Sequence, residues 1–254
     1  MNVIVSITAI LFGLLAGSFS NVVICRLPEG RSVVRPRSYC PACRKTIPWY
    51  ENIPVMSFLL LGGTCSGCGA PISPRYVVVE AIGAGLAYLT VMRFGITVNA
   101  VFVFSFLMAL VSITIIDWNH RIIPDAISLP FILIGLVWSF VSPALTPFSS
   151  VLGAVAGGGG LYAIGIAYRL VRHSEGMGGG DVKLMAMVGA FLGIQLVLPV
   201  ILIASLFGSM YGIALMKRGG NSKTSVAFGS FLAPAAAICT FFGTYLLSWY
   251  LQRF

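Results

Sequence analysis

The sequence predicts an all-α polytopic membrane protein that carries one small polar domain. Hydrophobic residues make up 58% of the 254-residue chain, charged residues only 9%, and the mean hydropathy is +0.97. Soluble domains have roughly 25% charged residues. Apolar runs long enough to cross a bilayer recur along the chain, and a four-cysteine pattern lies in its polar part. We therefore expect about eight transmembrane helices, with a small zinc-stapled cytoplasmic loop domain between helices 1 and 2.

Eight apolar segments are candidates for these helices. They cover approximately residues 3–24, 76–94, 98–117, 126–142, 148–168, 182–197, 198–216 and 230–250. The first segment makes up the first predicted domain, transmembrane helix 1 at residues 1–24. It has no basic n-region and no small-residue cleavage site, so we expect a retained anchor and not a signal peptide. The stretch 182–216 is one apolar run, and it must be divided between Gly193 and Pro199.

The segment 25–75 is polar and basic, and we expect it to form the cytoplasmic loop domain. Its apolar stretch, VMSFLLLGG, is too short to cross a bilayer. A domain of this size is close to the limit below which a metal or a disulfide usually supplements the core. The rest of the chain, residues 76–254, forms the second, membrane-embedded domain.

The net charge of +9 is explained by topology. With eight spans, fourteen of the sixteen Lys and Arg residues fall on one side, and only Arg93 and Arg253 fall on the other. The positive-inside rule makes the basic side cytoplasmic. We expect membrane lipids as partners of this basic surface. No base-reading motif accompanies the charge, so we expect no nucleic acid.

Four cysteines predict a structural zinc site. They form two C-x2-C pairs separated by 21 residues: Cys40, Cys43, Cys65 and Cys68. This spacing is typical of tetrahedral zinc sites, and glycines in the second pair allow a tight knuckle. The alternatives are two disulfides or unrelated thiols, and a reducing cytoplasm disfavours disulfides. The remaining two cysteines, Cys25 and Cys239, are expected to pack in spans.

Two aspartates are the strongest candidates for catalysis. The chain has seven acidic residues, yet Asp117 closes the apolar run 102–116, and Asp181 follows the sequence GMGGG and opens another run. Ionisable groups at such positions indicate a functional site. The alternatives are that Asp117 faces water and that Asp181 is a helix N-cap. Gly178 and Gly180 favour a site, because they permit close approach of another backbone.

Two carboxylates that converge can share a proton and perform acid–base chemistry. Both aspartates fall on the cytoplasmic side in the eight-span topology. Asp181 would lie at a helix N-terminus, which favours the anion, whereas Asp117 ends a helix, which favours the acid. We therefore expect Asp181 to be the resting base and Asp117 the acid.

The other titratable residues have simpler interpretations. Asp125 is expected to N-cap the span that follows it. Glu80 is either a first-turn helix carboxylate or a ligand for a cationic group. His120 and His173 lie in charged loops with no second histidine nearby, so we expect both to be solvated.

Several motifs in order resemble those of the prepilin peptidases, the type IV prepilin leader peptidases. They are LLAGSFSNVVICRLP (14–28), RSYCPAC (37–43), NIPVMSFLLLGGTCSGCGAPIS (52–73), RYVVVE (75–80), IDWNHRIIPD (116–125), GMGGGDVKLMAMVGAFLG (176–193) and FGSFLAP (228–234). The G-x-G-D signature of intramembrane aspartyl proteases is present at residues 178–181. The resemblance covers nearly the whole chain.

The resemblance implies an enzyme of the bacterial inner membrane with its active site facing the cytoplasm. Such enzymes cleave the leader of type IV prepilins or type II secretion pseudopilins. Bifunctional members then methylate the new N-terminus, usually Phe, with S-adenosylmethionine, and segment 25–75 would belong to that methyltransferase part. Asp117 and Asp181 match the catalytic positions and the four cysteines the zinc positions. No Rossmann-type fingerprint is present, so the S-adenosylmethionine site is not predicted.

Two residues depart from the family pattern. Asn119 stands where many relatives have a second Asp, which leaves Asp117 without a rival. Ser230 stands where Pro is common, and we expect it to touch nothing catalytic. The alternatives to a bifunctional enzyme are a peptidase without methyltransferase activity, a proton-coupled transporter that uses the same aspartates, and a zinc-loop adaptor without chemistry. The sequence does not predict the oligomeric state.

Overall fold

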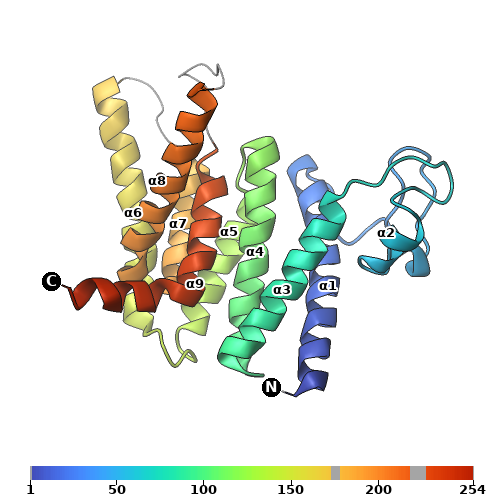
Figure 1. Cartoon of the computed structure of the whole chain (residues 1–254). Coiled ribbons are helices and arrows are strands. Elements are labelled where there is room, and N and C mark those ends of the chain that lie inside the picture. Colours follow the sequence, from blue (N-terminus) through green and yellow to red (C-terminus); the bar gives the residue numbers. More distant parts are fainter. Residues whose placement is uncertain (1, 173–177, 218–226, 254) are drawn as a thin grey trace. The chain divides into compact units, whose positions relative to one another are not determined.

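The structure is a computed structural model that describes residues 2–172, 178–217 and 227–253 (Figure 1). Regular structure in these residues is helical, apart from two isolated antiparallel bridges, Tyr39 with Thr46 and Thr64 with Pro71. The elements are α1 (Val3–Arg26), η1 (Leu27–Glu29), η2 (Trp49–Asn52), α2 (Met56–Leu60), α3 (Arg75–Phe94), α4 (Val98–His120), α5 (Asp125–Trp138), α6 (Pro147–Arg172), α7 (Gly179–Leu192), α8 (Ile194–Lys217) and α9 (Gly229–Leu251). The predicted all-α class is confirmed.

The chain forms two compact units, residues 1–108 and 109–254, with the boundary inside α4. In the first unit α1 and α3 pack backbone against backbone. A Cβ on Gly13 would lie 2.3 Å from the carbonyl oxygen of Gly83, and a Cβ on Gly17 would lie 2.6 Å from Cα of Glu80. Small residues at such positions let two spanning helices approach closely.

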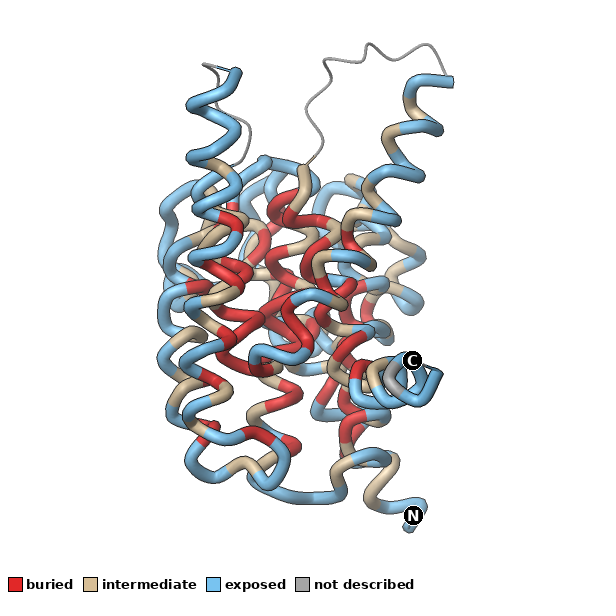
Figure 2. Tube along the Cα trace, turned by 90° about the vertical axis from the view of Figure 1, so that its left-hand side faces the viewer, coloured by how far each residue is buried: buried red, intermediate tan, exposed pale blue. Residues whose placement is uncertain are grey.

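The second unit is built around α7, which is buried on most of its surface. Leu184, Met185, Met187, Val188 and Ala190 are fully inaccessible. A helix that is apolar all round belongs in the interior of its unit. Along most other helices buried and exposed positions alternate, as expected for helices with one face packed against neighbours (Figure 2).

Helices α6 and α7 are in direct backbone contact. A Cβ on Gly189 would lie 2.0 Å from the carbonyl oxygen of Gly153. Ser150 Oγ, at the same crossing, donates a 2.6 Å hydrogen bond to the carbonyl oxygen of Ala190. This crossing fixes α7 and therefore the position of Asp181 at its N-terminus.

Six described helices are long and apolar enough to cross a membrane: α1, α3, α4, α6, α8 and α9. The other two predicted crossings correspond to α5 and α7, which have 14 residues each. At 1.5 Å per residue each is about 21 Å long, shorter than a hydrocarbon core of about 30 Å. The count of eight crossings therefore stays a prediction.

The apolar stretch 182–216 is divided at Gly193, one end of the expected interval and a few residues before the expected limit at 197/198. The chain turns at Gly193, with φ of +74°, so that α7 ends at Leu192 and α8 begins at Ile194. Pro199 lies inside α8 and does not end a helix. This positive φ, with ψ of 170°, is a conformation that glycine adopts readily and other residues rarely do, which places the break at Gly193. Helix α9 bends toward its C-terminal end (Figure 1).

Candidate active site and metal site

Asp117 lies in the last turn of α4 and is buried. Its exposed fraction is 4%, and Ile113 and Ile116 beside it are inaccessible. The alternative that Asp117 faces water is therefore wrong. A buried carboxylate needs hydrogen-bond donors, because burial without them is costly.

Asp181 is the third residue of α7, and the N-cap of this helix is Gly178. The capping alternative for Asp181 is therefore wrong as well. Its carboxylate instead accepts hydrogen bonds from the backbone amides of Gly229, at the N-terminus of α9, and of Gly178. The first turn of a helix favours a negative charge, and here two helix N-termini face the same carboxylate.

Gly229, the first residue of α9, lies between the two aspartates. A Cβ at Gly229 would lie 2.9 Å from Asp117 Oδ2, 3.1 Å from Asp181 Oδ1 and 2.7 Å from Cδ1 of Ile123. The two carboxylate oxygens are therefore at most about 6 Å apart, close enough for each charge to influence the other. Only a residue without a side chain fits between them.

Ser230, the next residue, contacts Asp117 directly. Its hydroxyl donates a 2.9 Å hydrogen bond to Asp117 Oδ2, and its exposed fraction is 5%. The expectation that Ser230 touches nothing catalytic is wrong. The same hydroxyl lies 3.4 Å from the carbonyl oxygen of Thr114, a second acceptor. Serine can therefore donate to an ionised Asp117, or accept from a protonated one while it donates to Thr114.

The glycines before Asp181 have different roles. A Cβ on Gly180 would lie 3.0 Å from Cβ of Ile123, so this position requires close approach, as expected. The contact of a Cβ on Gly178 with Asp181 would be an ordinary 3.7 Å. Gly178 acts as the extended N-cap of α7, with φ of −72°.

Asp125 does not cap α5. The N-cap is Pro124, and Asp125 is the first helical residue. Its carboxylate accepts two hydrogen bonds from Lys183 Nζ, at 2.7 and 2.8 Å. Both side chains are well exposed, so the pair links the starts of α5 and α7 at the surface.

An aromatic cluster lies next to the two aspartates. Trp118 follows Asp117 in α4, and its ring packs against Tyr211 of α8 and Phe231 of α9 at centroid distances of 5.4 and 6.4 Å. Trp118 is half-exposed. His120 and Asn119 are exposed, in agreement with the solvated interpretation of His120, whereas His173 lies outside the described residues.

The four predicted cysteine ligands form one cluster in the first unit. All four sulfur atoms lie within 4.8 Å of one another, and two pairs, Cys40 with Cys68 and Cys43 with Cys65, are separated by 3.9 and 4.0 Å. Zinc held by four thiolates at about 2.3 Å keeps its sulfurs about 3.8 Å apart. The described cysteines form no disulfide. The cluster therefore fits a tetrahedral metal ion.

The two C-x2-C pairs form matching backbone turns. The amide of Cys40 donates to the carbonyl oxygen of Lys45, and the amide of Cys65 donates to that of Ala70. The residue after each pair has a positive φ, +62° at Arg44 and +68° at Gly69. Glycine adopts this conformation readily, whereas arginine adopts it at a cost.

The surroundings shift the pKa values of two thiols of the cluster, Cys40 and Cys68, in opposite directions. Backbone amides of Cys43 and Ala42 lower the pKa of Cys40 to about 7. The backbone of Ala70 lowers the pKa of Cys68, but contacts with the other thiols and burial outweigh it and raise that pKa to about 11. Cys40 therefore gives up its proton more readily than Cys68, as expected for neighbouring thiols that interact.

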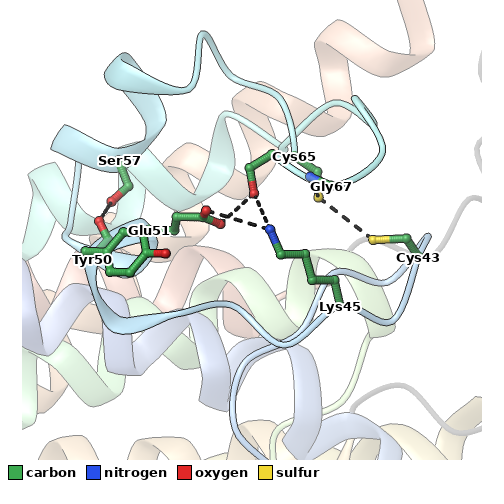
Figure 3. Close-up of polar contacts among 8 residues, drawn as sticks. Cys43, Lys45, Tyr50, Glu51, Ser57, Cys65 and Gly67 are labelled. Carbon is green, nitrogen blue, oxygen red and sulfur yellow. Dashed lines mark hydrogen bonds and ion pairs between the residues drawn. The ribbon is translucent and has the colours of Figure 1, made fainter.

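Polar contacts connect the cluster of four cysteines to η2 (Figure 3). Lys45 Nζ donates to Ser66 Oγ at 2.9 Å, and Ser66 Oγ donates to Glu51 Oε2 at 2.7 Å.

The remaining two cysteines, Cys25 and Cys239, lie apart from the cluster of four. Arg75 donates to Cys25 Sγ at 2.8 Å, and Cys239 is buried in α9, as expected for a packing residue.

Glu80 is buried in the second turn of α3, not the first. Its Oε2 accepts a 2.8 Å hydrogen bond from the backbone amide of Val55. Val55 has a positive φ of +62°, an uncommon conformation for a β-branched residue. Glu80 therefore holds the turn that precedes α2.

Sequence reasoning missed Gly229, Ser230 and Ile123 as parts of the site. Residues 228–234 showed the same signal as Asp181: a glycine followed by an apolar run after a basic, polar loop. The sequence could have suggested a helix N-terminus there. It could not show that this terminus lies between two aspartates that are more than 45 residues away.

Two family models match most of the chain. The model of the bacterial peptidase A24 N-terminal domain matches residues 11–94, and that of the type IV leader peptidase family matches residues 101–213. No solved structure matches the chain.

Curated relatives match over nearly the full length. A prepilin leader peptidase/N-methyltransferase of Pseudomonas aeruginosa is 36% identical over 96% of this chain and 92% of its own length. A protein of the same name from Aeromonas hydrophila is 36% identical over 96% and 93%. One from Myxococcus xanthus is 39% identical over 83% of this chain and 63% of its own length. The chain thus belongs to the type IV leader peptidase family.

Proposed function

We propose that this protein is a membrane aspartyl endopeptidase that cleaves the leader peptide of prepilins or pseudopilins and then methylates the new N-terminus. The family and the names of its relatives support both activities. The single structural observation that carries the peptidase activity is the convergence of Asp117 and Asp181 on Gly229. Two carboxylates so placed can hold one proton between them, the arrangement that aspartic proteases use.

Hydrolysis would use the two aspartates in different roles. Asp181, which two helix N-termini face, is proposed to activate the water. Asp117 would polarise the scissile carbonyl as the acid. Ser230 can serve Asp117 in either protonation state, because its hydroxyl has both Asp117 Oδ2 and the Thr114 carbonyl within reach. Infrared titration that found Asp117 ionised at lower pH than Asp181 would contradict these roles.

The substrate would be held by apolar contacts. Trp118, Tyr211 and Phe231 form an aromatic cluster beside the aspartates, suited to the hydrophobic helix of a prepilin. Basic loops, by contrast, repel a basic leader. We therefore expect KM for a prepilin to change little with ionic strength, because screening acts on exposed charges.

The four cysteines are proposed to hold a structural Zn2+, and S-adenosylmethionine is proposed as the methyl donor. The cluster geometry supports the first, and the names of the relatives support the second. The chain is a multi-pass membrane protein, and the inner membrane is its proposed location, with the active site facing the cytoplasm.

The test is processing of a prepilin by the purified protein in liposomes, with mass spectrometry of the product. We expect wild type to release the leader and to add one methylene to the mature N-terminus. Asp117→Asn and Asp181→Asn should fold yet leave the leader attached. Asp125→Asn, a matched change in an exposed carboxylate near the site, should still cleave.

Cleavage by either single Asn variant would make that aspartate structural and end the two-carboxylate mechanism. Proton-coupled transport in the absence of any processing would favour the transporter alternative. Processing without added mass would leave a peptidase alone.

A further inference from the structure

The small helix α2 has an exposed apolar face. This helix belongs to the cysteine lobe, which we define as residues 25–75. Met56, Leu59 and Leu60 are 57%, 69% and 78% exposed. Their spacing, i, i+3 and i+4, places them on one face of the helix. Just upstream, Trp49 and Tyr50 are exposed and pack edge to face at 5.8 Å. An exposed apolar cluster of this kind indicates an interaction surface.

Contacts with the long helices fix the level of α2 along them. The amide of Val55, directly before α2, donates to Glu80 Oε2 at 2.8 Å. Glu80 is five residues after the start of α3 at Arg75, which corresponds to about 7.5 Å along the helix. The backbone of Glu80 in turn packs on Gly17 of α1. In Figure 1, α2 accordingly lies beside the helices and not beyond their ends.

The two long helices place that level inside the bilayer boundary. Both α1 and α3 are candidate membrane spans. Helix α3 has 20 residues and is about 30 Å long, the thickness of a hydrocarbon core. A segment attached about 7.5 Å inside its end therefore lies where interfacial helices bury their apolar faces, some 5–10 Å deep.

We propose that α2 is inserted into the adjoining lipid leaflet, where acyl chains cover Met56, Leu59 and Leu60. Trp49 and Tyr50 lie at the headgroup level, the usual place for these residues. The predicted loop domain is then not a purely cytoplasmic module: it enters the membrane at a segment too short to span it.

This insertion connects the metal cluster to the bilayer. Ser57 Oγ of α2 donates to the carbonyl oxygen of Tyr50 in η2, and Ser66 Oγ, between Cys65 and Cys68, donates to Glu51 of the same η2 turn (Figure 3). The cysteine turns are thereby bonded to η2, and η2 is bonded to α2. Helix α2 in turn lies in the lipid leaflet. The metal-stabilised lobe is fixed at one depth and orientation relative to the membrane surface.

The test is photo-labelling of the full-length, metal-loaded protein in phosphatidylcholine–phosphatidylglycerol vesicles that contain a lipid with a diazirine on the upper acyl chain. Mass spectrometry of the peptide from Thr46 to Arg75 and of the peptide that contains Val34 locates the label. We expect residues 56–60 to carry at least about fivefold more label than Val34, because only the former reach the acyl region. Val34 is a matched control: it belongs to the same lobe and is 78% exposed.

A double substitution, Leu59→Asn with Leu60→Asn, gives an independent measurement. It should reduce labelling of this segment several-fold while bound metal and the labelling of α1 stay unchanged. Equal labelling of α2 and Val34 would overturn the proposal. So would a cross-link from α2 to a second protein chain in place of lipid, since that result would make the face a protein interface.

Discussion

At the level of single residues, the site depends on what surrounds the two aspartates. Asp117 and Asp181 are 64 positions apart in the sequence. A third segment completes the site: Gly229 lies between the two carboxylates, and Ser230 contacts Asp117. Asp117 is buried and Asp181 is half-buried, so each carboxylate depends on a small number of donors. Substitutions of these two neighbours therefore test the geometry without removing either aspartate.

Gly229→Ala is expected to reduce kcat by about a hundredfold, because a Cβ would push against both carboxylates and a shift of about 1 Å is enough for such a loss. The control is Gly159→Ala in α6, where a Cβ meets nothing within 4 Å. Steady-state processing assays of the two variants make the comparison. Equal activity would show that the carboxylates need not approach each other.

Ser230→Ala is expected to lower kcat about tenfold or more with KM nearly unchanged, since a hydrogen bond to a charged group contributes about 1.5–3 kcal/mol. Ser230→Thr should restore most of the activity. Ser150→Ala is the matched control, because it removes an equally buried hydroxyl that bonds only to a backbone carbonyl. If both alanine variants lose activity alike, Ser230 has a merely structural role.

At the level of elements, glycines decide which helices touch. The glycine-rich stretch at residues 157–160 of α6 predicts close helix packing. The structure confirms this for Gly157 and Gly158, which face α7, whereas Gly159 and Gly160 face open space. Helical periodicity explains the difference, because adjacent residues point to different faces.

Gly189→Ala is expected to destabilise the second unit, since its Cβ would lie 2.0 Å from a backbone oxygen of Gly153 that cannot move away cheaply. Overpacking of this kind costs about 1–3 kcal/mol or more. Gly160→Ala should be neutral or slightly stabilising. Thermal unfolding in detergent measures both, and a Gly189→Ala protein as stable as wild type would contradict the packing at this crossing.

At the level of the whole molecule, the long apolar helices and the cysteine lobe, residues 25–75 of the first unit, have different sources of stability. The membrane part has many apolar contacts, whereas the cysteine lobe contains few buried hydrophobic residues; Cys40 is one of them. A small lobe with so little apolar core is expected to gain folding free energy from a metal bound to its four cysteines.

Removal of the metal by a strong chelator, or Cys40→Ser with Cys43→Ser, is expected to expose the lobe to protease at the segment 40–75. The second unit should keep its resistance, because its packing does not involve the cysteines. Limited proteolysis with metal analysis of both samples tests this. The control is Cys239→Ser, which alters a cysteine outside the cluster; resistance of the metal-free lobe would show that the metal is dispensable.

The sequence by itself determined the membrane class, the four-cysteine cluster and the two candidate aspartates. These depend on composition and on short spacings, which local chemistry dictates: C-x2-C turns bring thiols together whatever surrounds them. The termini of helices were less certain: the expected cap at Asp125 was wrong because Pro124 occupies that position.

Only the tertiary structure decided what lies between the aspartates and what holds the cysteine lobe beside α3. The sequence predicts no catalytic contact for Ser230, yet folding brings its hydroxyl 2.9 Å from Asp117 Oδ2. Likewise, VMSFLLLGG is too short to span a membrane, but a hydrogen bond from Val55 to Glu80 holds it beside α3. Both contacts join residues at least 25 positions apart, and such pairings are set by helix packing rather than by local sequence.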